Sequence, residues 1–244
     1  KEFTVMLLIK NGHVKTMVGA DIENGCVLID DNGKIAAVGA CVEAPAGAQV
    51  IDACGALVTP GCVDAHCHIG LDNTAMRWEG MDYNEIVEPV TPQLRAIDSI
   101  NPMDESFPNA LRGGVTTAVT GPGSANVVGG TFVAIKLAGK RVDNMIVKNP
   151  VAMKVAFGEN PKGCYGNNKK SPMTRMAVVA LLRELLFKTK RYMEDKEAGK
   201  NPAFDMKLEA MIPVLKGEIP LKAHAHRADD ILSSIRVAKE FGVK

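Results

Sequence analysis

His66 and His68, separated by one residue, follow an apolar stretch with the composition of a β-strand. Side chains two residues apart on a strand point to the same face, so we expect the two imidazoles to lie together at the strand's end. Asp64 shares that face and can support an imidazole through a hydrogen bond. Imidazole nitrogens are common Zn²⁺ ligands, and the pair therefore predicts part of a metal site. The alternative is that two polar residues mark the rim of a sheet.

A second pair of histidines, His224 and His226, closes another expected strand, residues 220–225. By the same alternation these two side chains share a face, and either can contribute a metal ligand. An exposed polar strand end is the competing interpretation of this pair.

Lys154 lies within an apolar segment, residues 151–157, that we expect to be a buried strand. Burying an unpaired ammonium is costly, and desolvation lowers the pKa of a lysine and favours its neutral amine. A neutral, buried lysine has chemical uses that a solvated one lacks. The alternative is that the Lys154 side chain extends past the strand end and reaches solvent.

The elements that must position these residues fall into two parts. Residues 1–56 contain short apolar or alternating runs separated by turn signals such as Asp31-Asn32-Gly33, which predicts a small antiparallel β unit. From residue 57 onward, expected strands alternate with helices, which predicts a parallel sheet. Polar residues at the strand ends favour a barrel, whose active sites gather there. Residues 57–244 hold about five strand–helix units of the eight that a barrel needs, so we expect an incomplete enzyme.

The connecting segments carry weaker signals. The glycine-rich residues 121–130 lack the spacing of a phosphate-binding loop, and we expect a flexible loop at the rim of the sheet. We expect helices at residues 104–111, 173–197, 205–215 and 231–241, the second starting at Ser171-Pro172 and the third interrupted at Pro213.

Composition excludes several classes of partner. The balance of 29 basic against 28 acidic residues argues against a nucleic acid or an anionic membrane. No apolar run is long enough to span a bilayer, and we expect no signal peptide. The six cysteines have no CxxC spacing, so we expect reduced thiols in a cytoplasmic protein. Cys67, between the two histidines, should face away from them and pack in the core.

Residues 59–70, with the sequence TPGCVDAHCHIG, resemble the first-strand signature of the amidohydrolase superfamily of metal-dependent hydrolases. Within this superfamily, the chain is most similar to the branch related to imidazolonepropionases and dipeptidases. The resemblance implies a (β/α)8 TIM-like barrel, incomplete in this chain. It also implies a small β-sandwich-like domain, of which residues 1–56 would be the N-terminal half.

The same resemblance implies an activity and its requirements. The enzyme would hydrolyse an amide-like C–N bond in a small molecule, such as a cyclic amide or a dipeptide, with water activated by metal. One or two divalent ions, Zn²⁺ or another metal, would be bound. The protein would be a homo-oligomer.

The resemblance assigns a role to each candidate residue. His66, His68 and His224 would bind metal. Lys154, carboxylated by carbon dioxide, would bridge two ions in the catalytic centre. Glu159 competes for that role, because other branches place a glutamate at that level of the barrel. His226 would line the substrate pocket as a second catalytic residue.

Two other functions stay open for this sequence. A deaminase of the same superfamily would use one metal and a glutamate as proton shuttle, and a non-catalytic scaffold would bind no metal. The strand-six histidine and strand-eight aspartate of the family are not among these residues. We therefore expect the natural protein to continue for roughly 130–180 residues, scaled from a barrel of about 250 residues. The isolated chain should bind metal weakly and show negligible hydrolysis.

Overall fold

Two compact units make up the chain, one ending at Gly61 and the other running from Cys62 to Lys244. The structure, a computed structural model, describes residues 5–244. Strands and helices are mixed in the order that the predicted α/β class requires. Within the described residues, no helix combines the length and the apolar character that crossing a bilayer demands.

The smaller unit is a five-stranded sheet with the order β3-β2-β1-β4, in which β5 also pairs with β1. Its strands are β1 (Leu7–Val14), β2 (Ile22–Ile29), β3 (Ile35–Gly39), β4 (Gln49–Asp52) and β5 (Leu57–Val58). β1, β2 and β3 are antiparallel as predicted, whereas β4 and β5 run parallel to β1. Because β5 pairs with β1, residues 57–58 belong to this sheet, although the sequence placed the boundary at residue 56.

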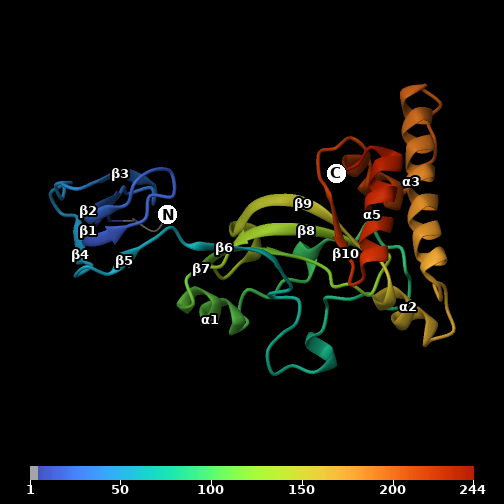
Figure 1. The fold of residues 1–244 in the computed structure, drawn as a ribbon, viewed down its shortest axis with the longest axis horizontal. Helices are drawn as coiled ribbons and strands as arrows, with labels where there is room; N and C mark the ends of the chain where they lie inside the picture. Colours follow the sequence, from blue (N-terminus) through green and yellow to red (C-terminus); the bar gives the residue numbers. More distant parts are fainter. Residues whose placement is uncertain (1–4) are drawn as a thin grey trace. The chain divides into compact units, whose positions relative to one another are not determined.

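The larger unit is built on a five-stranded sheet with the order β10-β9-β8-β7-β6. Figure 1 shows it as a curved half-barrel with helices α3 and α5 beside it. Its strands are β6 (Cys62–Cys67), β7 (Val115–Thr120), β8 (Val128–Lys136), β9 (Ile146–Ala156) and β10 (Leu221–His224). β6 runs parallel to β7 and β9 parallel to β10, but β8 is antiparallel to both of its neighbours. The prediction of a wholly parallel sheet is therefore wrong at β8.

β8 begins inside the glycine-rich residues 121–130, which the sequence predicted to be a flexible rim loop. The chain turns back after β7 and returns beside it without an intervening helix, so no helical pattern marks this connection. Gly130, within β8, has a φ of 116°, and a Cβ on it would lie 2.4 Å from the carbonyl oxygen of Leu94. Close approach of another backbone thus requires glycine here, and glycine interrupts the apolar pattern that would have marked a strand.

Five α-helices and three 3-10 turns complete the larger unit within the described residues. They are η1 (Trp78–Gly80), η2 (Ala96–Asp98), α1 (Ser106–Arg112), η3 (Val142–Asn144), α2 (Glu159–Gly166), α3 (Arg175–Glu197), α4 (Met206–Leu215) and α5 (Ala228–Phe241). α3 begins after Thr174, whose side chain accepts a hydrogen bond from the amide of Ala177, and not at Ser171-Pro172. α4 continues past Pro213 instead of breaking there, and α5 ends at Gly242 in the left-handed conformation, as glycine permits.

Side chains of β9 alternate between the two faces of the larger sheet. Met153, Val155 and Phe157 are buried in one apolar cluster with residues of α3, α4 and α5, such as Leu182. We call this the helix-covered face. Lys154, between Met153 and Val155, therefore points to the opposite side, the inner face of the sheet.

The outer side of β8 is covered by the segment that follows β6. Val133 and Ile135 of β8 are buried together with Leu71, Ala96 and Ile100 of that segment. The long excursion between β6 and α1 thus takes the place of a helix over this strand.

Asp104 fastens the same segment to the start of α1. Its Oδ2 accepts a hydrogen bond from the amide of Thr74 (2.6 Å), and its Oδ1 accepts from the Thr74 hydroxyl (3.1 Å) and from the amide of Ser106 (2.9 Å). Asp104 is only 7% exposed. Burial alone would raise the pKa of this carboxyl, but the hydrogen bonds from Ser106 and Thr74 outweigh burial and hold its pKa below the usual value.

The substitution Asp104→Asn should lower the free energy of unfolding by roughly 1–3 kcal/mol at neutral pH, because buried amides lose a charged acceptor. A carboxyl whose folded-state pKa is depressed stabilises the fold above its unfolded pKa and stops doing so as pH falls through the folded pKa. The difference between wild type and variant, measured by urea unfolding, should therefore shrink at about pH 3. An equal difference at both pH values would contradict this role for the charge.

Gly158 links β9 to α2 under two constraints. Its φ is 77°, and a Cβ at this position would lie 2.2 Å from Oδ2 of Asp230, a buried residue of α5. Any other residue would meet both the strain of left-handed backbone and a collision with a carboxylate.

Gly158→Ala is expected to lower the free energy of unfolding by about 1–2 kcal/mol for backbone strain and by roughly 1–3 kcal/mol more for the collision. Gly114→Ala is the matched control, because Gly114 has a φ of 83° but nothing within 4 Å of where a Cβ would lie. Thermal or urea unfolding of both variants separates the two contributions. An equal loss of unfolding free energy in the two variants would show that the Asp230 side chain moves aside without destabilising the fold.

Candidate metal centre

The inner face of the sheet gathers nitrogen-bearing side chains from β9 and β10. Lys154 and Lys222 are direct partners in the register of these parallel strands, and His224 pairs with Ala156. Residues two apart on a strand share a face, so Lys154, Lys222 and His224 all lie on the inner face. This arrangement places two of the predicted site residues together.

The histidine pair at the end of β6 lies as its spacing predicts. The ring centroids of His66 and His68 are 5.5 Å apart. Nδ1 of His68 lies 2.7 Å from the carbonyl oxygen of Gly121, and because a carbonyl only accepts, Nδ1 carries the proton and Nε2 is left free. Asp64 accepts a hydrogen bond from the amide of His66 (3.0 Å). Cys67 packs with the apolar cluster on the other face, as expected.

His224 carries the clearest sign of an absent partner. Its Nε2 is buried and has no hydrogen-bond partner among the described residues. A buried polar atom without a partner costs free energy, so such an atom calls for an explanation, of which an ion is one. The ring of His226 stands edge-on to that of His224, with 4.5 Å between centroids.

Phe132 of β8 lies at the centre of the candidate residues. Phe132 is fully buried, and its ring centroid is 5.3 Å from that of His66. The distance from the Phe132 centroid to Nζ is 5.8 Å for Lys154 and 5.2 Å for Lys222. Gly121 makes room for this ring, because a Cβ there would lie 2.4 Å from Phe132. The ring thus forms an apolar floor on which two ammonium groups and an imidazole rest.

Burial and neighbouring charge change the protonation of these groups. Burial, followed by repulsion from Lys222, lowers the pKa of Lys154 to about 8, and Lys154 is 1% exposed. Burial, followed by repulsion from Lys154 and Lys222, lowers the pKa of His66 to about 4. Burial is also the main cause of the lowered pKa of His224. Both imidazoles are therefore neutral near pH 7, which is the form that binds metal.

Glu159, the predicted competitor of Lys154, is bound elsewhere. It begins α2, and its Oε2 lies 3.1 Å from Nη2 of Arg175, which also pairs with the buried Asp230 at 2.8 Å. About half of the Glu159 side chain is exposed. The structure thus places Lys154 on the inner face and holds Glu159 by an arginine of α3.

The histidines alone do not form a complete ligand set for a Zn²⁺-like ion. Within residues 5–244, no three His, Cys, Asp or Glu side chains cluster closely enough to hold an ion. The structure therefore brings His66 to His68 and His224 to His226, but it does not join these pairs into one complete ligand set. A carboxylate on Lys154 would add the oxygen donors that the neutral histidines lack.

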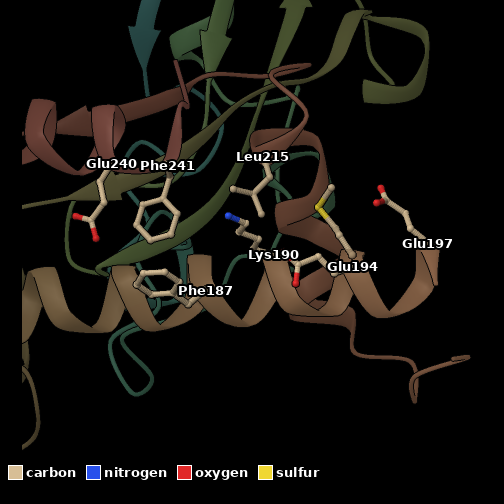
Figure 2. Close-up of a pocket in the computed structure, with 8 residues that line it drawn as sticks. Phe187, Lys190, Glu194, Glu197, Leu215, Glu240 and Phe241 are labelled. Carbon is tan, nitrogen blue, oxygen red and sulfur yellow. The ribbon is translucent and has the colours of Figure 1, made fainter. Parts of the chain in front are cut away.

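The helix side of the larger unit carries a groove of a different character. The volume of this groove is about 370 Å³. It lies between α3, α4 and α5, and Figure 2 shows Phe187, Leu215 and Phe241 among Glu194 and other charged side chains. No histidine or cysteine lines it. The groove lies on the helix-covered side of the sheet, opposite Lys154, and it is not part of the candidate centre.

Two inner-face residues, Phe132 and Lys222, were not singled out by sequence reasoning. Phe132 lies in β8, which was not predicted as a strand because it begins within the glycine-rich residues 121–130. Lys222 carried a usable signal, because it has the same strand parity as His224 and stands in an apolar strand, as Lys154 does.

No family model matches the chain, but it is similar to known proteins both in sequence and in structure. Amidohydrolase tasK of Hapsidospora irregularis is 28% identical over 244 residues, covering 90% of this chain and 24% of that protein. An adenine deaminase of Listeria monocytogenes is 31% identical over 184 residues, covering 74% of this chain and 26% of its own length. The chain thus spans about a quarter of these curated relatives.

A solved structure extends the likeness to three dimensions. The crystal structure of an amidohydrolase from Thermotoga maritima is 43% identical, with a TM-score of 0.93 over 98% of this chain and 63% of that one. By fold and by sequence, the chain belongs to the amidohydrolase superfamily.

Proposed function

We propose that the chain supplies the first half of the catalytic barrel of a metal-dependent hydrolase that cleaves an amide-like C–N bond, as in a cyclic amide or a dipeptide. One observation carries this proposal. The buried Nε2 of His224 has no hydrogen-bond partner among the described residues. His224 lies on the same face of the sheet as Lys154, and His66 and His68 lie at the end of β6 on that face. Three histidines and a buried lysine from three strands on one face suit a metal centre in which the lysine supplies oxygen after carboxylation.

His66, His68 and His224 are the proposed histidine ligands, and Lys154 supplies oxygen after carboxylation. The neutral amine of Lys154 adds to carbon dioxide, forming an N–C bond and releasing one proton, and the carbamate offers two oxygens. Its carboxylate would also neutralise the charge of Lys222 beside it. Glu159 remains the competing source of oxygen, and its pairing with Arg175 is the reason we favour Lys154.

A Zn²⁺-like ion, when bound, lowers the pKa of water toward neutrality and polarises the carbonyl under attack. The chain's own residues prepare the site for it. The carbonyl of Gly121 holds His68 in the tautomer that leaves Nε2 free. The ring of Tyr83 lies beside that of His68, with 5.9 Å between centroids. His226, beside His224, is the proposed catalytic residue that lines the substrate pocket.

Names of the relatives support the reaction class. They include amidohydrolases, dihydroorotases and an adenine deaminase, which are hydrolases acting on C–N bonds. The deaminase matches 74% of this chain, so a deaminase with a single ion is the second candidate function. A scaffold without metal is the third, and the number of ions bound separates the three.

The remaining parts of the proposal follow from the same class. The substrate is a small molecule, and the enzyme is a cytoplasmic homo-oligomer of the branch related to imidazolonepropionases and dipeptidases. The unit that ends at Gly61 contributes to its small β domain, and the unit from Cys62 to Lys244 contributes to its barrel.

The first test is the metal content of the intact protein that carries this sequence, measured by elemental analysis after dialysis against Zn²⁺. Wild type should retain one or two ions for each chain. His66→Asn and His68→Asn should each weaken Zn²⁺ binding by at least about 10–100-fold, because each removes a nitrogen ligand. His13→Asn is the control, because His13 lies in the smaller unit and pairs with Asp21 and Glu23. Equal Zn²⁺ content in all four proteins would refute the site.

The second test asks whether Lys154 is carboxylated. Protein equilibrated with ¹³C-bicarbonate should show a carbamate carbon by NMR, and Lys154→Met should lack this signal and one bound ion. Lys136→Met, which alters another lysine of the same sheet, should keep both. A carbamate-free wild type whose Zn²⁺ content falls in Glu159→Gln would transfer the role to Glu159.

A further inference from the structure

Lys222 makes a contact that crosses the larger sheet from edge to edge. Its Nζ donates a hydrogen bond to the carbonyl oxygen of Ala65 at 2.7 Å, although 157 residues separate the two along the chain. Lys222 is on β10 and Ala65 on β6, the two outermost strands of the sheet. In a flat sheet of this width, with about 4.8 Å between strands, the edges would lie about 19 Å apart, beyond the reach of any lysine. The bond therefore exists only because the sheet is curved.

The acceptor belongs to the peptide group that leads into the first histidine of the candidate centre. The carbonyl oxygen of Ala65 accepts from Lys222, and the amide of His66, in the same peptide group, donates to Oδ1 of Asp64 at 3.0 Å. A peptide plane held at its oxygen and at its nitrogen cannot rotate freely. Its orientation fixes the direction in which the Cα–Cβ bond of His66 leaves the chain.

Phe132 fixes the other partner of this contact. The Nζ of Lys222 lies 5.2 Å from the centroid of the Phe132 ring, within the range of a cation–π contact. The same ring lies beside His66, at 5.3 Å between centroids. Lys222, His66 and the ring between them thus form one packed group that spans β6, β8 and β10.

We propose that Lys222 is a positioning residue that ties β10 to β6 across the inner face and so sets the separation of His66 and His68 from His224. The effect on metal binding rests on the proposed function. The contact between Lys222 and Ala65 does not, because it is made in the chain without metal. Lys222 contacts the peptide group that precedes His66, and it lies two residues before His224 on β10. It would act on the metal through the positions of these two histidines.

The test compares Lys222→Met, which keeps the apolar stem but removes the donor, with Lys222→Arg, which keeps a donor. Lys136→Met is the matched control, because Lys136 also lies on an inner strand and its Nζ donates to Oγ1 of Thr117 at 2.9 Å, but on the adjacent strand β7. In the metal-free intact protein, hydrogen exchange of the His66 amide should become about tenfold faster in Lys222→Met, and not in the other two variants, because local opening of β6 becomes easier.

The second measurement is the binding of Co²⁺, followed by its visible absorption spectrum. Lys222→Met should bind Co²⁺ about 10–100-fold more weakly and with an altered spectrum, and Lys222→Arg should restore most of both. Unchanged exchange at His66 in a folded Lys222→Met protein would overturn the tie. Faster exchange with unchanged Co²⁺ binding would overturn its role in setting the ligand separation. A wild type that binds no Co²⁺ would instead refute the proposed function, while the exchange experiment still decides the tie.

Discussion

The burial of Lys154 on the inner face is the constraint around which the larger unit is arranged. On β9 its neighbours Met153 and Val155 enter the core beneath the helices, and this fixes the direction of the lysine. A buried amine needs either a partner or the loss of its charge, and the structure offers it an aromatic ring and a second lysine. This environment lowers the pKa of Lys154 to about 8 and so increases the fraction of neutral amine near pH 7.

Much of this centre could be predicted from strand parity alone. The alternation that places His66 beside His68 is local, and so is the pattern that buries Lys154. The antiparallel β8 was not predicted, because Gly129 and Gly130 interrupt its apolar pattern, and Gly130 is required by the close approach of the backbone of Leu94. Phe132 was missed together with β8, although its ring lies beside His66, Lys154 and Lys222.

The competition between Lys154 and Glu159 shows a second limit of local reasoning. Both residues follow from the sequence as candidates, and nothing near them in the chain separates them. The difference arises from α3 and α5, where Arg175 binds the buried Asp230 and also holds Glu159. The ion pair between Arg175 and Asp230, 55 positions apart in the sequence, thus keeps Arg175 where it binds Glu159 and favours Lys154 as the source of oxygen for a metal.

The segment between β6 and α1 is restrained on both sides of Tyr83, the residue that it places beside His68. It passes near the histidines, through Tyr83, and a long loop in that place would ordinarily be taken for a mobile lid. Here Leu71, Ala96 and Ile100 are buried under β8, and lifting the segment would expose the core of the sheet. The segment is thereby held at Leu71 on one side of Tyr83 and at Ala96 and Ile100 on the other, so any movement near Tyr83 is limited to the residues between these anchors.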